Sequence, residues 1–168
     1  MRVNVGFLLN QPKGTYRDFP FDLPGIELSK DVITGQLIGN ARISRTSEGL
    51  LVQGDYRTHI SAICVRCLEN TEPELHIEFT ELYVFPQLHT DEFDTEDEPE
   101  LIVPSDGYID MEPLVREYLL LEIPMKPLCK PDCKGLCSFC GANLNQDTCE
   151  HQKQGANPAA LYPLTPGS

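Results

Sequence analysis

The clearest periodicity lies in the middle of the chain. Apolar and polar positions alternate from Val32 to Ile43, from Leu50 to Ile63 and from Leu75 to Phe85. This period of two is typical of half-buried strands. Polar turns around Gly49 and Asn70 separate the three runs. We therefore expect three long antiparallel strands that form a meander.

Two further elements flank the meander. Residues 2–9 alternate loosely and predict a first strand that ends at the turn 10–14. Asp110 is typical of a helix N-cap, and apolar residues recur after it at helical spacing until Pro124. The pattern predicts one helix over about residues 110–123. Its apolar face is formed by Met111, Leu114, Val115, Tyr118 and Leu119.

Two stretches show no clear period. Residues 15–31 contain Pro20, Pro24 and Gly25 and are predicted to be irregular. Residues 89–100 hold seven acidic residues and almost nothing to bury. We interpret them as a solvated loop, with a site for a basic partner as the alternative.

The charge of the chain limits its partners. In 168 residues, 13 basic and 26 acidic side chains leave a formal net charge of −13 and a pI near 4.6. A uniformly acidic surface repels a phosphate backbone, which disfavours broad nucleic-acid binding and favours a basic partner.

The apolar runs and the cysteines predict a compartment. No run has the length of a signal peptide or of a membrane-spanning helix. We therefore expect a cytoplasmic protein, whose thiols stay reduced. In that setting clustered cysteines favour metal over disulfides, and their odd number, seven, agrees.

The cysteines also indicate the chemistry of the chain. One C-x2-C pair lies at residues 64–67, and five more cysteines and a histidine lie within residues 129–151. Thiolates at such spacing can face one cation, and Zn²⁺ prefers four N or S ligands in a tetrahedron. We predict one or two zinc ions. The predicted ligands are Cys64, Cys67, Cys129, Cys133, Cys137, Cys140, Cys149 and His151.

The spacing leaves two partitions of these ligands open. The first joins the 64–67 pair to Cys129 and Cys133, and leaves the last four ligands, from Cys137 on, as a local site. The second joins the four cysteines from Cys129 to Cys140 and leaves the first pair unmatched. A zinc ion with four protein ligands has no open position for water or substrate, so these sites are expected to staple the chain.

Together these patterns predict an α+β protein. It is mostly an antiparallel β meander or partial barrel, with one main helix and a C-terminal zinc knuckle. We place the sheet domain with its helix at residues 1–124, the cysteine-rich zinc-binding segment at 125–151 and a flexible tail at 152–168.

No catalytic signature stands out. The chain has no phosphate-binding loop, no dinucleotide fingerprint and no paired-carboxylate signature. We therefore expect no enzyme, no catalytic residue and no small-molecule substrate. A thiol redox protein is the less favoured reading of the C-x2-C pairs, because it needs a helix N-terminus in a βαβ setting.

Five segments, in order, carry a family resemblance: GLLVQG (49–54), CVRCLE (64–69), FTELY (79–83), DMEPLVREYLLLEIPMKPLC (110–129) and CKGLCSFCGANLN (133–145). Together they resemble the YceD-like family of bacteria and plastids, the large ribosomal RNA subunit accumulation proteins. The resemblance spans about residues 30–151.

The resemblance implies a cytoplasmic factor for accumulation of large-subunit ribosomal RNA, with no established catalysis. It also implies that the pair at residues 64–67 is the family hallmark and that the later cysteines match a cysteine-rich branch. That branch often ends its cluster in C-x-C, whereas this chain has His151, which is also a zinc ligand. The family's DPR stretch is reduced here to residues 157–159, Asn-Pro-Ala.

Charge and resemblance together predict how such a factor works. We expect a non-enzymatic factor that acts on large-subunit precursors through a basic ribosomal protein, using acidic surface that includes residues 91–100. The alternative is a zinc module that contacts ribosomal RNA directly through Lys126, Lys130 and Lys134.

Overall fold

The computed structural model describes residues 1–30, 32–86 and 101–151. The chain divides into two compact units. The sheet unit consists of Met1–Ser61 and Glu74–Pro124, and the cysteine unit consists of Ala62–Pro73 and Met125–Ser168. The acidic stretch at 89–100 and the tail at 152–168 lie outside the described residues.

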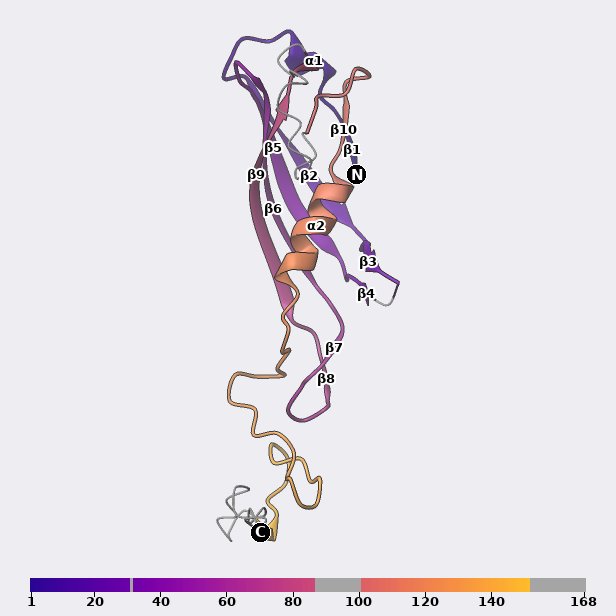
Figure 1. The fold of residues 1–168 in the computed structure, drawn as a ribbon, viewed down its shortest axis with the longest axis vertical. Helices are drawn as coiled ribbons and strands as arrows, with labels where there is room; N and C mark the ends of the chain where they lie inside the picture. The colour runs from indigo at the N-terminus through magenta and orange to yellow at the C-terminus, as the bar shows by residue number, and fades with distance from the viewer. Residues whose placement is uncertain (31, 87–100, 152–168) are drawn as a thin grey trace, which may run out of the picture. The chain divides into compact units, whose positions relative to one another are not determined.

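A four-stranded antiparallel sheet forms the sheet unit (Figure 1). Its order is β2-β5-β6-β9, where β2 is Tyr16–Leu23, β5 is Leu37–Arg45, β6 is Gly49–His59 and β9 is Glu74–Val84. The last three strands are the predicted meander, and the sheet is open at β2 and β9. Alternation of buried and exposed residues along β6 and β9 gives the sheet one apolar and one polar face.

Helix α2, Glu112–Glu122, packs on the apolar face. The Tyr118 ring stacks on Phe79 of β9 at 4.8 Å between centroids, and the Tyr118 hydroxyl donates a hydrogen bond to Glu81. The N-cap is Met111 rather than Asp110, although Asp110 Oδ1 does accept a hydrogen bond from the Glu112 N–H at 3.0 Å. The helix completes the core of the unit.

Two predictions for the first 31 residues are wrong. The expected strand over residues 2–9 is a short strand, β1 (Arg2–Asn4), followed by a four-residue helix, α1 (Gly6–Leu9). The stretch expected to be irregular contains β2. Its Pro20 cannot donate a ladder hydrogen bond, but β2 is an edge strand, where proline is tolerated.

Three small pairings complete the fold. Strand β1 pairs with β10 (Tyr108–Asp110), and β3 (Glu27–Ser29) pairs with β4 (Val32–Ile33). In the cysteine unit, β7 (Ala62–Ile63) pairs with β8 (Asn70–Thr71). The predicted α+β class, with mostly antiparallel strands, one main helix and a C-terminal cysteine cluster, is confirmed.

No helix among the described residues combines the length and apolarity needed to cross a membrane.

Candidate metal centre

Four cysteine sulfurs converge in the cysteine unit. Cys64 and Cys67 come from the turn between β7 and β8, and Cys129 and Cys133 come from the segment after α2. All four sulfurs lie within 4.8 Å of one another, with Sγ–Sγ distances of 3.8 Å for Cys64–Cys133 and 3.5 Å for Cys67–Cys129. Sulfurs placed tetrahedrally about 2.3 Å from a zinc ion are about 3.8 Å apart. The geometry therefore fits a four-cysteine metal site, here called the first ligand group.

The first ligand group is shielded from water. Cys64, Cys67 and Cys133 are at most 4% exposed, and Leu128 and Leu136 pack against them. Such a shell lowers the local dielectric and limits access of competing ligands.

The remaining four predicted ligands form a second ligand group. Cys137, Cys140, Cys149 and the ring of His151 place one ligand atom each within 4.8 Å of one another. This group is more open, because Cys140 and His151 are exposed. The His151 ring stacks on exposed Phe139, with centroids 5.4 Å apart. The structure thus groups the eight side chains in the first of the two partitions that the spacing allowed.

The two C-x2-C pairs lie in separate backbone turns that have the same hydrogen-bond pattern. The N–H of the residue after the second cysteine donates to the carbonyl of the first at 2.9 Å, from Leu68 to Cys64 and from Gly141 to Cys137. The N–H of the first cysteine donates a hydrogen bond of 2.8 Å to the carbonyl of the residue five positions later, from Cys64 to Glu69 and from Cys137 to Ala142. Both turns need a positive φ, which is 73° at Gly141 and 60° at Leu68.

The thiols of the first group differ in pKa, because they differ in their hydrogen bonds to sulfur. Burial raises the pKa of Cys64, but backbone N–H groups, from Cys67 first, outweigh burial and hold it at about 6. Burial and then the neighbouring sulfurs raise the pKa of Cys129 to about 12. Four crowded thiols therefore cannot all ionise alone, whereas a divalent cation would stabilise all four thiolates.

The second group already favours a thiolate. Backbone N–H groups of Cys140 and Phe139 lower the pKa of Cys137 to about 6. This is the hydrogen-bond pattern by which a knuckle turn supports a metal-bound sulfur.

Two supporting residues bind the first group to the rest of the unit. Asn145 Nδ2 lies 3.3 Å from the Cys133 sulfur, while Asn145 Oδ1 accepts the Lys134 N–H at 2.8 Å. Arg66 Nη1 donates to the Cys133 carbonyl at 2.9 Å. Sequence reasoning missed Asn145, because no local pattern connects it with a sulfur twelve residues away.

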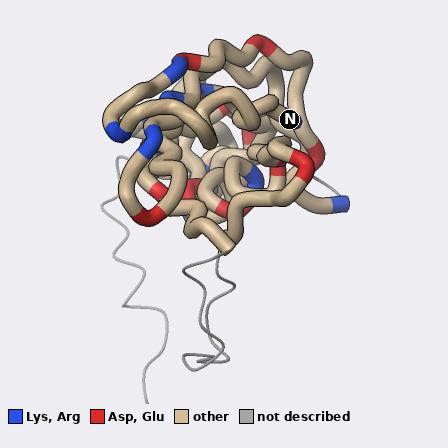
Figure 2. The backbone as a smooth tube through the Cα atoms, turned by 90° about the horizontal axis from the view of Figure 1, so that it is seen from above, with Lys and Arg blue, Asp and Glu red and all other residues tan. Residues whose placement is uncertain are grey.

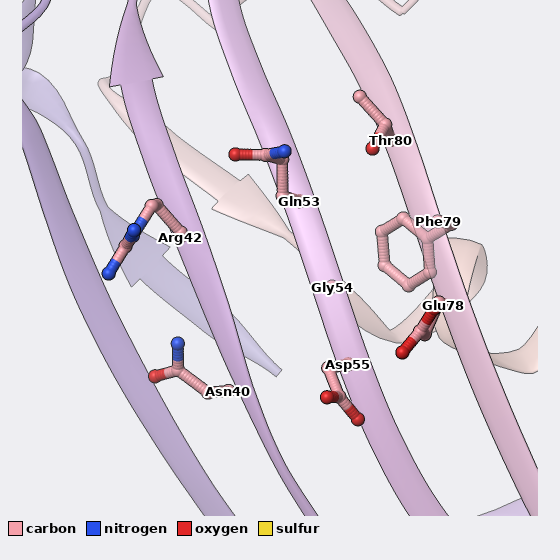
Figure 3. A pocket seen from close by; sticks show the side chains of 8 residues that line it. All are labelled: Asn40, Arg42, Gln53, Gly54, Asp55, Glu78, Phe79 and Thr80. Atoms are coloured by element: carbon pink, nitrogen blue, oxygen red, sulfur yellow. The ribbon is translucent and has the colours of Figure 1, made fainter.

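The polar face of the sheet carries a third, exposed group. His76 Nε2 lies 3.0 Å from Asp55 Oδ1 and 3.7 Å from Glu78 Oε1. Asp55 and Glu78 also line a hollow of about 450 Å³ whose polar side chains, among them Asn40 and Arg42, rise from β5, β6 and β9 (Figure 3). All three side chains of this group are exposed to solvent, and hydrogen bonding is enough to explain why they lie together.

Comparison with known proteins identifies one family whose model spans both ligand groups. The family model described as large ribosomal RNA subunit accumulation protein YceD matches residues 52–165. That range contains all eight predicted ligands.

Curated relatives also match. An uncharacterized protein of Mycobacterium tuberculosis is 36% identical over 113 residues, which cover 67% of this chain and 54% of the relative. An Arabidopsis thaliana protein named large ribosomal RNA subunit accumulation protein YCED homolog 1, chloroplastic, is 28% identical over 158 residues, which cover 80% and 46%. The chain thus spans about half the length of these relatives. No solved structure matches it.

Proposed function

The chain belongs to the YceD family, and on that premise we propose that it is a non-enzymatic factor for accumulation of large-subunit ribosomal RNA. The family match over residues 52–165 is the observation that carries this proposal. The printed name of the Arabidopsis relative, which is aligned over most of this chain, supports it.

The two ligand groups serve as structural zinc sites in this proposal. Cysteine thiolates and one imidazole form the donor sets that Zn²⁺ prefers, and each group supplies four ligands. Bound zinc would cross-link the segments that carry the ligands. With four protein ligands each site has no position for a substrate, which supports a role outside catalysis.

The partner in this proposal is a basic ribosomal protein. The polar face of the sheet carries five carboxylates, against the guanidinium groups of Arg42 and Arg57. These carboxylates are Asp18, Asp22, Asp55, Glu74 and Glu78. Along the described backbone as a whole, both acidic and basic positions occur (Figure 2). A face with this excess would steer and hold a basic polypeptide.

Affinity capture of the tagged protein from its own cells, with and without nuclease, tests this function. We expect large-subunit proteins that remain bound after nuclease treatment. The variant Asp55→Lys/Glu74→Lys/Glu78→Lys should lose them. The matched control Glu48→Lys/Glu117→Lys/Glu122→Lys makes the same charge change at exposed sites off this face and should keep them.

Direct RNA contact by the cysteine unit is the second candidate. Lys126, Lys130 and Lys134 are all exposed in that unit, which favours it. If nuclease removes every captured partner, and Lys126→Glu/Lys130→Glu/Lys134→Glu abolishes RNA recovery, this candidate replaces the protein-mediated one.

A further inference from the structure

Arginines of the sheet unit lie repeatedly over aromatic rings. Five such pairs occur among the described residues, involving Arg2, Arg17, Arg42 and Arg45. The environment of Arg17 differs from that of Arg2 and Arg42.

Arg17 is held by rings alone. Its guanidinium carbon lies 5.0 Å from the centroid of Phe7 and 5.8 Å from that of Phe19. Arg2 and Arg42 each have a carboxylate partner, Asp106 and Asp18, but Arg17 has none among the described residues. Rings that pack on the face of a guanidinium leave its N–H edge free to donate.

A hollow of about 720 Å³ opens beside this arrangement. Arg2, Phe7, Arg17 and Phe19 line it, from β1, α1 and β2, together with Asp106, which precedes β10; we call it the arginine–aromatic hollow. Its volume falls in the range of about 300–1,000 Å³ that is usual for small-ligand sites. Phe7 is 40% exposed, so part of its ring is open to a ligand.

The local charge also differs from that of the whole chain. The described lining of the hollow carries two arginines, Arg2 and Arg17, and one carboxylate, Asp106, whereas the chain as a whole carries −13. A free guanidinium edge next to an exposed ring matches a phosphate next to a base, which is the usual chemistry of single-strand recognition.

We propose that the arginine–aromatic hollow binds a nucleotide unit of single-stranded RNA, with a base on Phe7 and a phosphate on the free edge of Arg17. The site lies in the sheet unit and needs neither the metal centres nor a protein partner. It therefore goes beyond the proposed function, and either can fail without the other.

The acidic charge of the chain limits the number of phosphate contacts that it can make with RNA. Asp106 accepts a hydrogen bond from Arg2 at 3.0 Å, so Arg17 is the main cation free for a phosphate. One or two phosphate contacts give a salt slope of about −0.7 to −1.4 for a single strand. Stacking therefore contributes much of the affinity, and binding should depend only weakly on salt.

Fluorescence anisotropy of a labelled twelve-nucleotide single-stranded RNA, titrated with the full chain at several salt concentrations, tests the proposal. We expect Phe7→Ala to weaken binding about tenfold, since stacking on an aromatic ring is worth roughly 1–3 kcal/mol per base. Arg17→Glu should weaken it at least as much, because it replaces the phosphate donor by a like charge. Phe7→Trp should retain binding.

Two controls separate this hollow from other charges. Arg57→Glu reverses one charge on the polar face, and Lys126→Glu/Lys130→Glu/Lys134→Glu alters the cysteine unit; both should leave affinity within about twofold. Circular dichroism of each variant verifies folding, with Phe7→Leu as the milder ring removal. Absence of RNA binding by the unmodified chain, equal losses in Arg17→Glu and Arg57→Glu, or a steep salt slope would overturn the proposal.

Discussion

The two units are held together in different ways. Among the described residues, the sheet unit has a continuous core of 22 buried apolar side chains, from Val3 to Leu119. The buried cluster of the cysteine unit consists of Cys64, Cys67 and Cys133, with Leu128, Cys129 and Leu136 partly buried around it. The hydrophobic effect therefore stabilises the first unit, whereas the second has little apolar surface to bury.

The two units are therefore expected to differ in how much their folds depend on metal. Chains below about 40 residues seldom bury enough surface to fold without disulfides or metals. The described part of the cysteine unit, residues 62–73 and 125–151, is of that size and contains both ligand groups. If the two groups bind metal as proposed, the segments around each group should fold only with their metal bound, while the fold of the sheet unit should be independent of metal.

Chelation should produce the largest effect. Structural zinc contributes on the order of 10 kcal/mol of apparent binding free energy to a small domain, so its removal should unfold the cysteine unit. Hydrogen exchange followed by mass spectrometry should show protection lost at residues 62–73 and 125–151 and kept in β5, β6 and β9. Equal loss, or equal retention, of hydrogen-exchange protection in both units would show that they do not differ in their dependence on metal.

A core truncation should have the opposite distribution. Ile43 is fully buried on β5, and its replacement by alanine should cost about 2–5 kcal/mol and lower the melting temperature of the sheet unit. Ile38→Ala, on the polar face of the same strand where the side chain is 52% exposed, is the matched control with little expected effect. Bound metal, measured by emission spectrometry, should be unchanged in both. Metal loss in the folded Ile43→Ala variant would show that the units are coupled.

Acid and alkali should act on different units. The hydrogen bond to Glu81 raises the pKa of Tyr118 to about 12, above its ordinary value of 10.0. The unfolded chain therefore loses this proton first, and the contribution of Tyr118 to stability, fully present below pH 10, is lost as pH rises to about 12. Acid instead protonates the thiolates, and protons compete with metal in the cysteine unit.

Titration of the unmodified chain and Tyr118→Phe by near-ultraviolet absorbance and melting temperature measures this effect. The variant should lose less stability than the unmodified chain between pH 10 and 12. Identical alkaline profiles would rule out the contribution of Tyr118.

The two knuckle turns offer the smallest test. Leu68 is 64% exposed and holds a φ of 60°, a conformation that costs about 1–2 kcal/mol for a residue with a Cβ. Leu68→Gly should therefore stabilise the turn by up to about 1 kcal/mol, and Gly141→Ala should destabilise the equivalent turn by a similar amount. Local hydrogen exchange measures both, and the same sign for both substitutions would contradict the equivalence of the turns.

The sequence alone predicts those parts of the fold that show a local periodicity of apolar residues. Alternation located β5, β6 and β9, and helical spacing located α2. It missed β2, because Pro20 and Pro24 resemble loop signals unless the edge position is known. It missed α1, since four residues hold only one turn of a helical period.

The candidate metal ligands could be predicted from the sequence for a different reason. Ligand type and C-x2-C spacing predicted the eight side chains as ligands, and the structure gathers them in two groups, but the choice between partitions needed the tertiary arrangement that joins Cys64 to Cys133. Asn145 and the arginine–aromatic hollow depend on such arrangement alone. Phe7 and Arg17 meet from different elements, and no periodic pattern connects them.

Native mass spectrometry of the purified protein counts the metal ions that the two ligand groups bind. We expect two zinc ions per unmodified chain, and one in each of the double variants Cys64→Ser/Cys67→Ser and Cys137→Ser/Cys140→Ser, since each removes two ligands from one group. A protein with no bound metal, or one in which either double variant loses both ions, would contradict two independent metal centres.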